Sequence, residues 1–117
     1  MCPDCGLDHT YNARCGKSFT LADIQQRAFE HAKSKGFHDL PEVSVFRFAA
    51  LIHSEVSELV EAYHKGDLFK EAKPGMTAAE EELADIVIRV ADFAEWLTID
   101  LHTAVLKKMH HLLGEKN

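Results

Sequence analysis

The chain has 117 residues, of which 46% are hydrophobic, and this supports one domain with a modest core. Its formal net charge of −6 argues against the basic surface with which general nucleic-acid-binding proteins hold phosphate backbones. No apolar stretch approaches the length of a membrane span, and the N-terminus does not resemble a signal peptide. We therefore expect a cytoplasmic protein without a nucleic-acid or membrane partner.

Residues 1–19 form a short cysteine-rich head, and residues 20–117 form a separate helical domain in this interpretation. The head has the order C-x2-C-x3-H-x5-C, which is close to a zinc knuckle but has its histidine displaced by one position. Three thiolates and one imidazole can complete a tetrahedral Zn²⁺ site, whereas a reducing cytosol disfavours disulfides. The alternative is an unstructured segment with free thiols. The candidate zinc ligands are Cys2, Cys5, His9 and Cys15.

The first helix is predicted to begin after Thr20. Thr20 and Asp23 have the spacing of a capping box, with aspartate in place of the usual glutamate. This helix should end near Lys35, with Gly36 as its C-cap.

The second helix is predicted to start at Glu42 or Val45, with Pro41 tolerated at its start. It should extend to Lys65, where Gly66 stops it.

The rest of the chain is predicted to contain a loop and two more helices. Residues 66–76 include a Pro-Gly pair, which is typical of a loop. A capping box at Thr77–Glu80 should start the third helix, which reaches about Leu97. Asp100 can cap a fourth helix that ends near Gly114. Four helices with short connections imply an all-α protein, an antiparallel four-helix bundle.

Two pairs of carboxylates lie at the edge of apolar stripes on the second and third helices. Glu55 and Glu58 are three residues apart, as are Glu82 and Asp85, so the members of each pair lie about 60° apart on a helix. In both helices the carboxylate pair lies on the same side of the apolar stripe. Packing the two stripes together could therefore bring four carboxylates into one pocket. The stripes contain Ile52, Val56, Leu59 and Tyr63 on one helix, and Leu83, Ile86, Val90, Phe93 and Leu97 on the other.

Four neighbouring carboxylates repel one another and raise one another's pKa unless a cation neutralises them. Hard divalent cations do so, and Mg²⁺ or Mn²⁺ suits a set of carboxylate ligands that leaves positions for water and phosphate. The alternative is that these residues form a solvated face, as glutamates at helical spacing usually do.

The chain from Leu21 to Met109 resembles the MazG-like all-α nucleoside triphosphate pyrophosphohydrolases, whose signature is E-x-x-E followed by E-x-x-D. Residues 59–81 separate the two halves here, which is a normal gap for that family. The segments that carry the resemblance are Ile24 to Phe37, Ser54 to Ala62, Glu81 to Arg89 and Ile99 to Leu101.

The resemblance implies a Mg²⁺-dependent hydrolase that converts a nucleoside or deoxynucleoside triphosphate to the monophosphate and pyrophosphate. It implies that the metal ligands are Glu55, Glu58, Glu82 and Asp85. Glu55 or Glu58 could instead act as the catalytic carboxylate that orients the attacking water. Members of the family form dimers or tetramers, so we expect a homodimer or homotetramer.

Residues outside the signature could support the metal or bind substrate. Asp92 could be a supporting or additional ligand, and the alternative is an exposed partner of Arg89. Arg89 could contact phosphate, whereas an intrahelical pair with Asp85 is the simpler expectation.

The C-terminal helix departs from the family pattern. Lys108 and Met109 match it, but Leu112 and Glu115 stand near positions where close relatives carry a nucleotide-binding asparagine and arginine. Either another cation takes that role, or this member has a shifted or reduced activity. The same departure favours the alternative function, a non-catalytic zinc-headed helical module that binds a partner or a nucleotide. The candidate replacement cations are Lys107, Lys73 and Arg89.

Several large apolar residues exceed what one thin core should hide, which also favours a symmetric oligomer. They are Phe46, Phe48, Leu68, Phe69 and Trp96.

A metal analysis tests the head. Protein purified under reducing, chelator-free conditions should carry about one zinc ion per chain, and replacing Cys5 should remove it while the helical circular dichroism stays unchanged. Wild-type protein without zinc would identify the head as a tail with free thiols.

Overall fold

The computed structural model describes residues 20–114, which form four α-helices, a short 3₁₀ helix and a two-stranded antiparallel ribbon. The candidate zinc ligands and Glu115 lie outside these residues. None of the helices within 20–114 is both long and apolar enough to cross a membrane. In chain order the elements are α1 (Leu21–Ser34), the 3₁₀ helix η1 (Phe37–Asp39), α2 (Val45–His64), β1 (Glu71–Lys73), β2 (Met76–Thr77), α3 (Ala78–Trp96) and α4 (Leu101–Gly114).

The predicted extent of α1 is confirmed, except that the C-cap is Lys35 and not Gly36. The Thr20 hydroxyl accepts from the Asp23 backbone N–H, and the Asp23 carboxylate accepts from the Thr20 backbone N–H. Lys35 is the C-cap, and Gly36 follows with φ 79°, a left-handed conformation in which most other residues are strained.

Helix α2 begins at the later of the two predicted positions. The Ser44 hydroxyl caps it by accepting from the Arg47 N–H, so Pro41 lies in the turn before the helix and not at its first position. The helix ends at His64, and Gly66 takes a left-handed φ of 74°.

The loop predicted for residues 66–76 is wrong in part, because β1 and β2 pair there, with Glu71 opposite Thr77. These strands are too short to give a periodic signal in the sequence. Two further backbone bonds, from Ala78 to Lys70 and from Ala79 to Leu68, attach the ribbon to the start of α3.

The starts of α3 and α4 agree with the prediction. Thr77 and Glu80 form a complete capping box on α3. The Asp100 carboxylate accepts from the Thr103 N–H at the start of α4.

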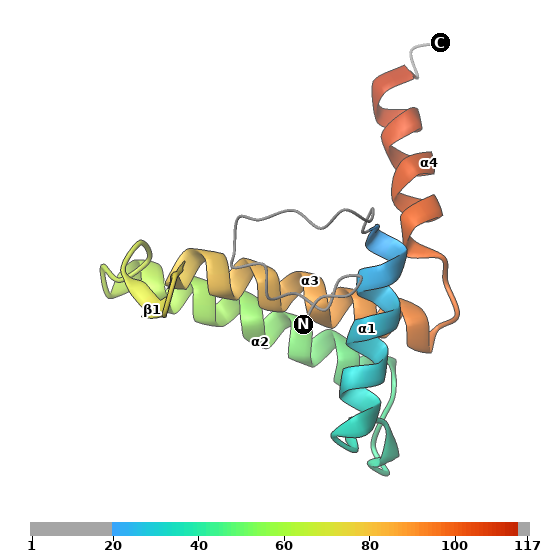
Figure 1. Cartoon of the computed structure of the whole chain (residues 1–117), viewed down its shortest axis with the longest axis horizontal. Helices are drawn as coiled ribbons and strands as arrows, with labels where there is room; N and C mark the ends of the chain where they lie inside the picture. The colour runs from blue at the N-terminus through green and yellow to red at the C-terminus, as the bar shows by residue number, and fades with distance from the viewer. Residues whose placement is uncertain (1–19, 115–117) are drawn as a thin grey trace.

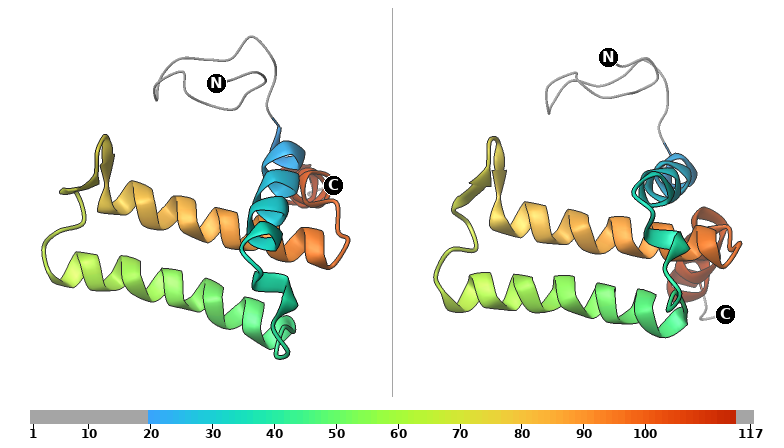
Figure 2. Two further views of the ribbon diagram at one scale, coloured as in Figure 1. Left: turned by 60° about the horizontal axis from the view of Figure 1, so that its bottom comes forward. Right: turned by 90° about the horizontal axis from the view of Figure 1, so that it is seen from below.

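Helix α3 is the centre of the fold. It runs antiparallel beside α2, while α1 crosses its other side and makes no comparable contact with α2 (Figures 1 and 2). Helix α4 touches α1 and α3 near its start and then projects away from the α2–α3 pair (Figure 1). The mainly helical class is confirmed, and the antiparallel arrangement is present in α2 and α3, but α4 does not lie alongside them.

The core is built around aromatic rings at one end of the α2–α3 pair. Phe48 is buried and stacks on Phe93, with ring centroids 4.8 Å apart and planes 4° apart. Trp96 packs against Phe48, with ring centroids 4.9 Å apart. Such contacts add about 0.5–1.5 kcal/mol each beyond the apolar area that they bury.

A buried glutamine joins α1 to the connection between α3 and α4. The Gln25 amide donates to a Glu95 carboxylate oxygen and to the Ile99 carbonyl, and its own carbonyl accepts from the Leu101 N–H. All of these bonds form between segments far apart in sequence, so the side chain fixes one end of α1 on α3.

One flank of the α2–α3 pair stays exposed, although both stripes were expected to be buried. Val56, Tyr63, Leu83 and Leu97 belong to those stripes and are exposed. Helix α1 covers α3 from the other side, so in one chain nothing within residues 20–114 packs over this flank. Phe46 and Phe69 are also largely exposed, whereas Phe48 is in the core.

Candidate metal centre

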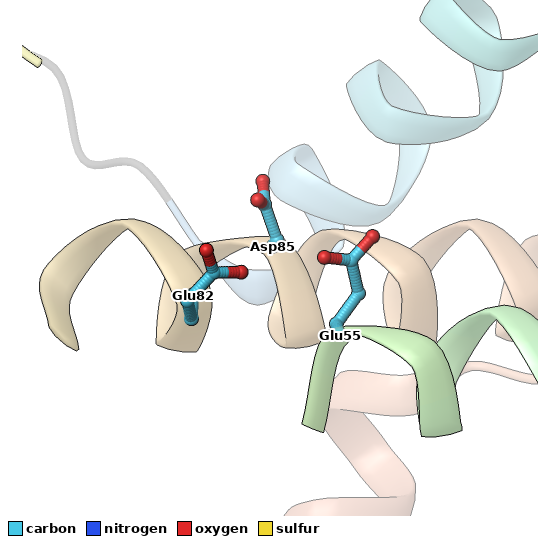
Figure 3. A group of neighbouring side chains, drawn as sticks. All are labelled: Glu55, Glu82 and Asp85. Atoms are coloured by element: carbon cyan, nitrogen blue, oxygen red, sulfur yellow. The ribbon is translucent and has the colours of Figure 1, made fainter. Parts of the chain in front are cut away.

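Three of the four predicted carboxylates meet at the contact between α2 and α3. Glu55 projects from α2 toward Glu82 and Asp85 of α3 (Figure 3). One oxygen of each lies within 4.8 Å of the others. These three residues are called the carboxylate cluster below.

Glu58 lies outside the carboxylate cluster. It is exposed, one turn along α2 from Glu55. Its charge nevertheless raises the pKa of Glu82, so the fourth predicted carboxylate stays within electrostatic range.

The carboxylate cluster disfavours its own ionisation. Burial, followed by the charges of Glu58, Asp85, Glu55 and Glu81, raises the pKa of Glu82 to about 7. Burial and the neighbouring carboxylates also raise the pKa of Asp85. One oxygen of Glu82 is buried and has no hydrogen-bond partner. A buried oxygen without a donor is unfavourable, and a cation at this place would satisfy it.

Arg89 forms an ion pair with a member of the carboxylate cluster. Its Nε donates to Oε2 of Glu55 at 3.1 Å, where Glu55 is nearly buried. The expected ion pair with Asp85 is replaced by this contact, because α2 packs beside α3 and brings Glu55 within reach. Arg89 still lowers the pKa of Asp85 through its charge.

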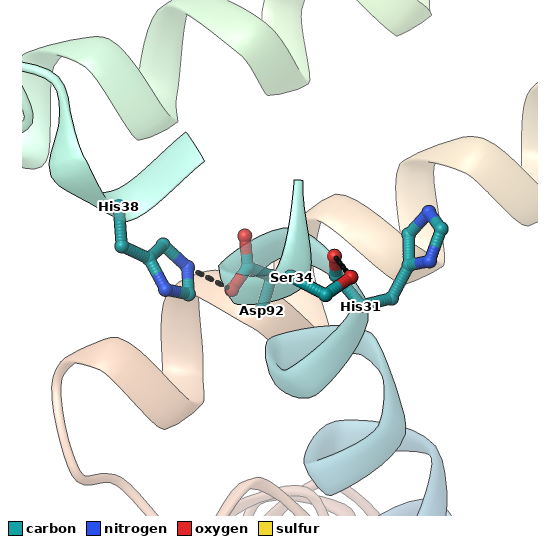
Figure 4. A network of polar contacts seen from close by, with 4 residues as sticks. All are labelled: His31, Ser34, His38 and Asp92. Carbon is teal, nitrogen blue, oxygen red and sulfur yellow. Dashed lines mark hydrogen bonds and ion pairs between the residues drawn. The ribbon is translucent and has the colours of Figure 1, made fainter. Parts of the chain in front are cut away.

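Asp92 is buried, so the alternative of an exposed partner for Arg89 is wrong. It does not belong to the carboxylate cluster, and Oδ1 of Asp92 lies 2.9 Å from Nε2 of His38 (Figure 4). Burial raises the pKa of Asp92, while the bond from His38 lowers it.

Sequence reasoning missed His38. It sits in η1, between α1 and α2, in a stretch too short to show periodicity, and packs against the Phe29 ring at 4.5 Å. Nδ1 of His38 is buried without a partner. Gly36 was the only local signal in the sequence. It predicts a turn after α1, but it does not indicate that His38 in this turn contacts Asp92.

Two cavities lie on this side of the molecule, and Phe37, Arg89 and Asp92 line both, but only the first is lined by members of the carboxylate cluster. The first, about 210 Å³, is also lined by Glu55 and Asp85 and by residues of α1. The second cavity, about 130 Å³, is more apolar. The residues that line the second cavity but not the first are His38, Val43, Arg47, Phe48 and Leu51. His31 of α1 faces the first cavity, on the opposite side of Asp92 from His38 (Figure 4).

The other candidate cations differ in their distance from the site. Lys73 bonds Glu81 at 2.8 Å, and the charges of Glu82 and Asp85 help to raise its pKa, so it lies near the carboxylate cluster. Lys107 and Lys108 are exposed on α4 and line neither cavity.

Comparisons with models of protein families, with curated proteins and with solved structures found no match. Function is therefore inferred from the residues of this chain.

Stability as a function of pH tests the electrostatics of the carboxylate cluster. Because the folded state raises the pKa of Glu82 from 4.5 to about 7, it binds a proton more tightly than the unfolded chain does. The contribution of Glu82 to the stability of the metal-free protein should therefore fall as the pH rises through this interval. Glu82→Gln should be the more stable protein at pH 8 by roughly 1–3 kcal/mol and similar to wild type at pH 4.5.

The measurement is urea unfolding in EDTA at both pH values. Glu61→Gln is the matched control, because Glu61 is exposed and pairs only with Lys65 in the described contacts. Equal pH profiles for wild type and Glu82→Gln would contradict the raised pKa.

Proposed function

We propose that this protein is a Mg²⁺-dependent nucleoside triphosphate pyrophosphohydrolase of the MazG-like type. The observation that carries the proposal is the convergence of three carboxylates from two helices, one of which, Glu82, has a buried oxygen without a hydrogen-bond partner. Oxygen-only ligands close together suit a hard divalent cation. The same arrangement favours a metal site over a solvated face as the role of the carboxylates in the E-x-x-E and E-x-x-D signature.

The residues that would hold the cation are Glu55, Glu82 and Asp85, with Glu58 close by. When bound, the ion supplies positive charge for phosphate oxygens and lowers the pKa of a coordinated water. Mn²⁺ prefers similar ligands and could take its place.

Glu58 is the better candidate for the carboxylate that orients the attacking water. Glu55 is already bonded to Arg89 and belongs to the carboxylate cluster, whereas Glu58 is exposed and outside it. The proposed reaction is attack of water on the α-phosphorus, with the water proton passing to this carboxylate. The bond from the α-phosphorus to its bridging oxygen breaks, and pyrophosphate leaves.

Arg89 and Lys73 are the cations best placed to hold the phosphates. Arg89 lines both cavities, and Lys73 lies near the carboxylate cluster on the ribbon that precedes α3. Lys108 could contribute only from another chain in this arrangement, since it is exposed on α4 and lines neither cavity.

A nucleotide panel tests the reaction. With Mg²⁺, the protein should release pyrophosphate and a nucleoside monophosphate from at least one triphosphate. Glu58→Ala and Asp85→Ala should each lower kcat/KM by about 100-fold or more, because each removes a carboxylate from the reacting site. Both should keep the helical circular dichroism and equal or exceed the metal-free thermal stability of wild type, because repulsion falls.

Glu61→Ala is the control and should stay active. Orthophosphate as the only product would contradict attack at the α-phosphorus. Metal binding without any hydrolysis would favour the non-catalytic module.

We also propose a homodimer or homotetramer, because one continuous apolar flank is uncovered. Val56 and Val60 of α2 and Leu83 and Val87 of α3 lie about 100–140° from the facing carboxylates Glu55 and Glu82 of their own helices. In an antiparallel pair this places them on one side, away from α1. A second copy could bury that side through a twofold axis.

Light scattering should report at least twice the chain mass of 13.2 kDa. Val60→Lys should lower the measured mass toward the monomer by placing a charge in the interface. Ser54→Lys is the control, since Ser54 is exposed on the same helix about 120° away. A monomer at all concentrations would contradict this assembly.

A further inference from the structure

Glu55 has two oxygens in different surroundings. Oε2 accepts from Arg89 Nε at 3.1 Å, which leaves Oε1 without that bond. Figure 3 shows one oxygen of Glu55 turned toward Glu82 and Asp85 and the other turned away from them. We assign the oxygen that is turned away as Oε2, because Arg89 lies one helical turn beyond Asp85, in the direction away from Glu82.

The contact between Arg89 and Glu55 is protected from water at its Glu55 end, whereas the Arg89 side chain is 31% exposed. The Glu55 side chain is 9% exposed, so the carboxylate has little room to exchange Arg89 for water. A charge-assisted bond at a nearly buried carboxylate is among the stronger polar contacts, and it restrains the rotation of the carboxylate.

Two common divalent cations use carboxylates differently. Ca²⁺ takes six to eight oxygens and often binds both oxygens of one carboxylate, whereas Mg²⁺ requires a near-octahedral shell and usually binds one oxygen from each. Each carboxylate oxygen has two lone pairs, but an oxygen that already accepts a charged hydrogen bond has less room and less negative charge for a metal, so the other oxygen is the preferred ligand.

We propose that Arg89 is a positioning residue that restricts Glu55 to one metal-binding oxygen and thereby favours Mg²⁺ over Ca²⁺ at the carboxylate cluster. This inference rests on the proposed metal site and concerns which ion that site selects. Only Nε is bonded to Glu55 in the described contacts, so the terminal nitrogens of Arg89 remain available to phosphate.

The test compares dissociation constants for Mg²⁺ and Ca²⁺, measured by competition against Mn²⁺ with the signal of free Mn²⁺ in electron paramagnetic resonance. Arg89→Gln should lower the ratio of the Ca²⁺ to the Mg²⁺ dissociation constant by about tenfold, because Glu55 can then bind Ca²⁺ through both oxygens. Mg²⁺ and Ca²⁺ carry the same charge. The loss of the Arg89 charge, or of protein stability, therefore changes both dissociation constants by the same factor, which cancels in their ratio.

Arg47→Gln is the matched control. Arg47 is similarly exposed, lines the second cavity and pairs with Glu42 at 3.6 Å, so the substitution removes the same charge away from Glu55. Its ratio should equal that of wild type. An unchanged ratio in Arg89→Gln would overturn the inference, whereas wild-type protein that binds none of the three ions would overturn the metal site itself.

A measurement on wild-type protein covers the case in which Arg89→Gln does not fold. The Arg89 Nε–H resonance, assigned by comparison with Arg89→Lys, should persist when Mg²⁺ is added, because its bond to Oε2 remains. Ca²⁺ should shift or broaden that resonance by competing for Oε2. The proposal would be contradicted if Mg²⁺ also broke the bond between Arg89 Nε–H and Oε2, or if Ca²⁺ left that bond unchanged.

Discussion

The packing of α2 against α3 places Glu55 beside Glu82 and Asp85 in a partly buried contact, where like charges repel strongly. The chain tolerates this in two ways. Arg89 neutralises part of the charge through Glu55, and Glu82 keeps a proton to higher pH than an ordinary glutamate. The rest of the molecule has to hold the two helices together against this repulsion.

The contacts that hold the helices lie at the opposite end of the α2–α3 pair from the ribbon. Phe48 of α2 stacks on Phe93 and packs at a tilt against Trp96 of α3, and Gln25 joins α1 to the end of α3. The stabilising contacts and the repelling carboxylates therefore occupy different stretches of the same interface. Such a separation is common where a binding site costs stability, because the unfavourable groups have to be fixed by packing elsewhere.

Helix α1 and η1 complete the site from the third side. They bring His38 onto Asp92 and supply walls to both cavities, so the carboxylate cluster lies at the edge of a hollow and not on an open helical face. The opposite, apolar flank of α2 and α3 is the part of the molecule that one chain leaves uncovered. The two sides of one helix pair thus have different chemistry, one polar and hollow, the other apolar.

The sequence alone determined the helices and their ends, because caps such as Thr20 with Asp23 and Thr77 with Glu80 act within a few residues. It also indicated which carboxylates share a helical face, since that follows from spacing. Only the tertiary structure decided that Arg89 bonds Glu55 instead of Asp85, that Glu58 stays outside the carboxylate cluster and that Asp92 is buried under His38. The physical reason is that these contacts join residues more than 30 positions apart, and the packing of whole helices brings them together, which no local pattern encodes.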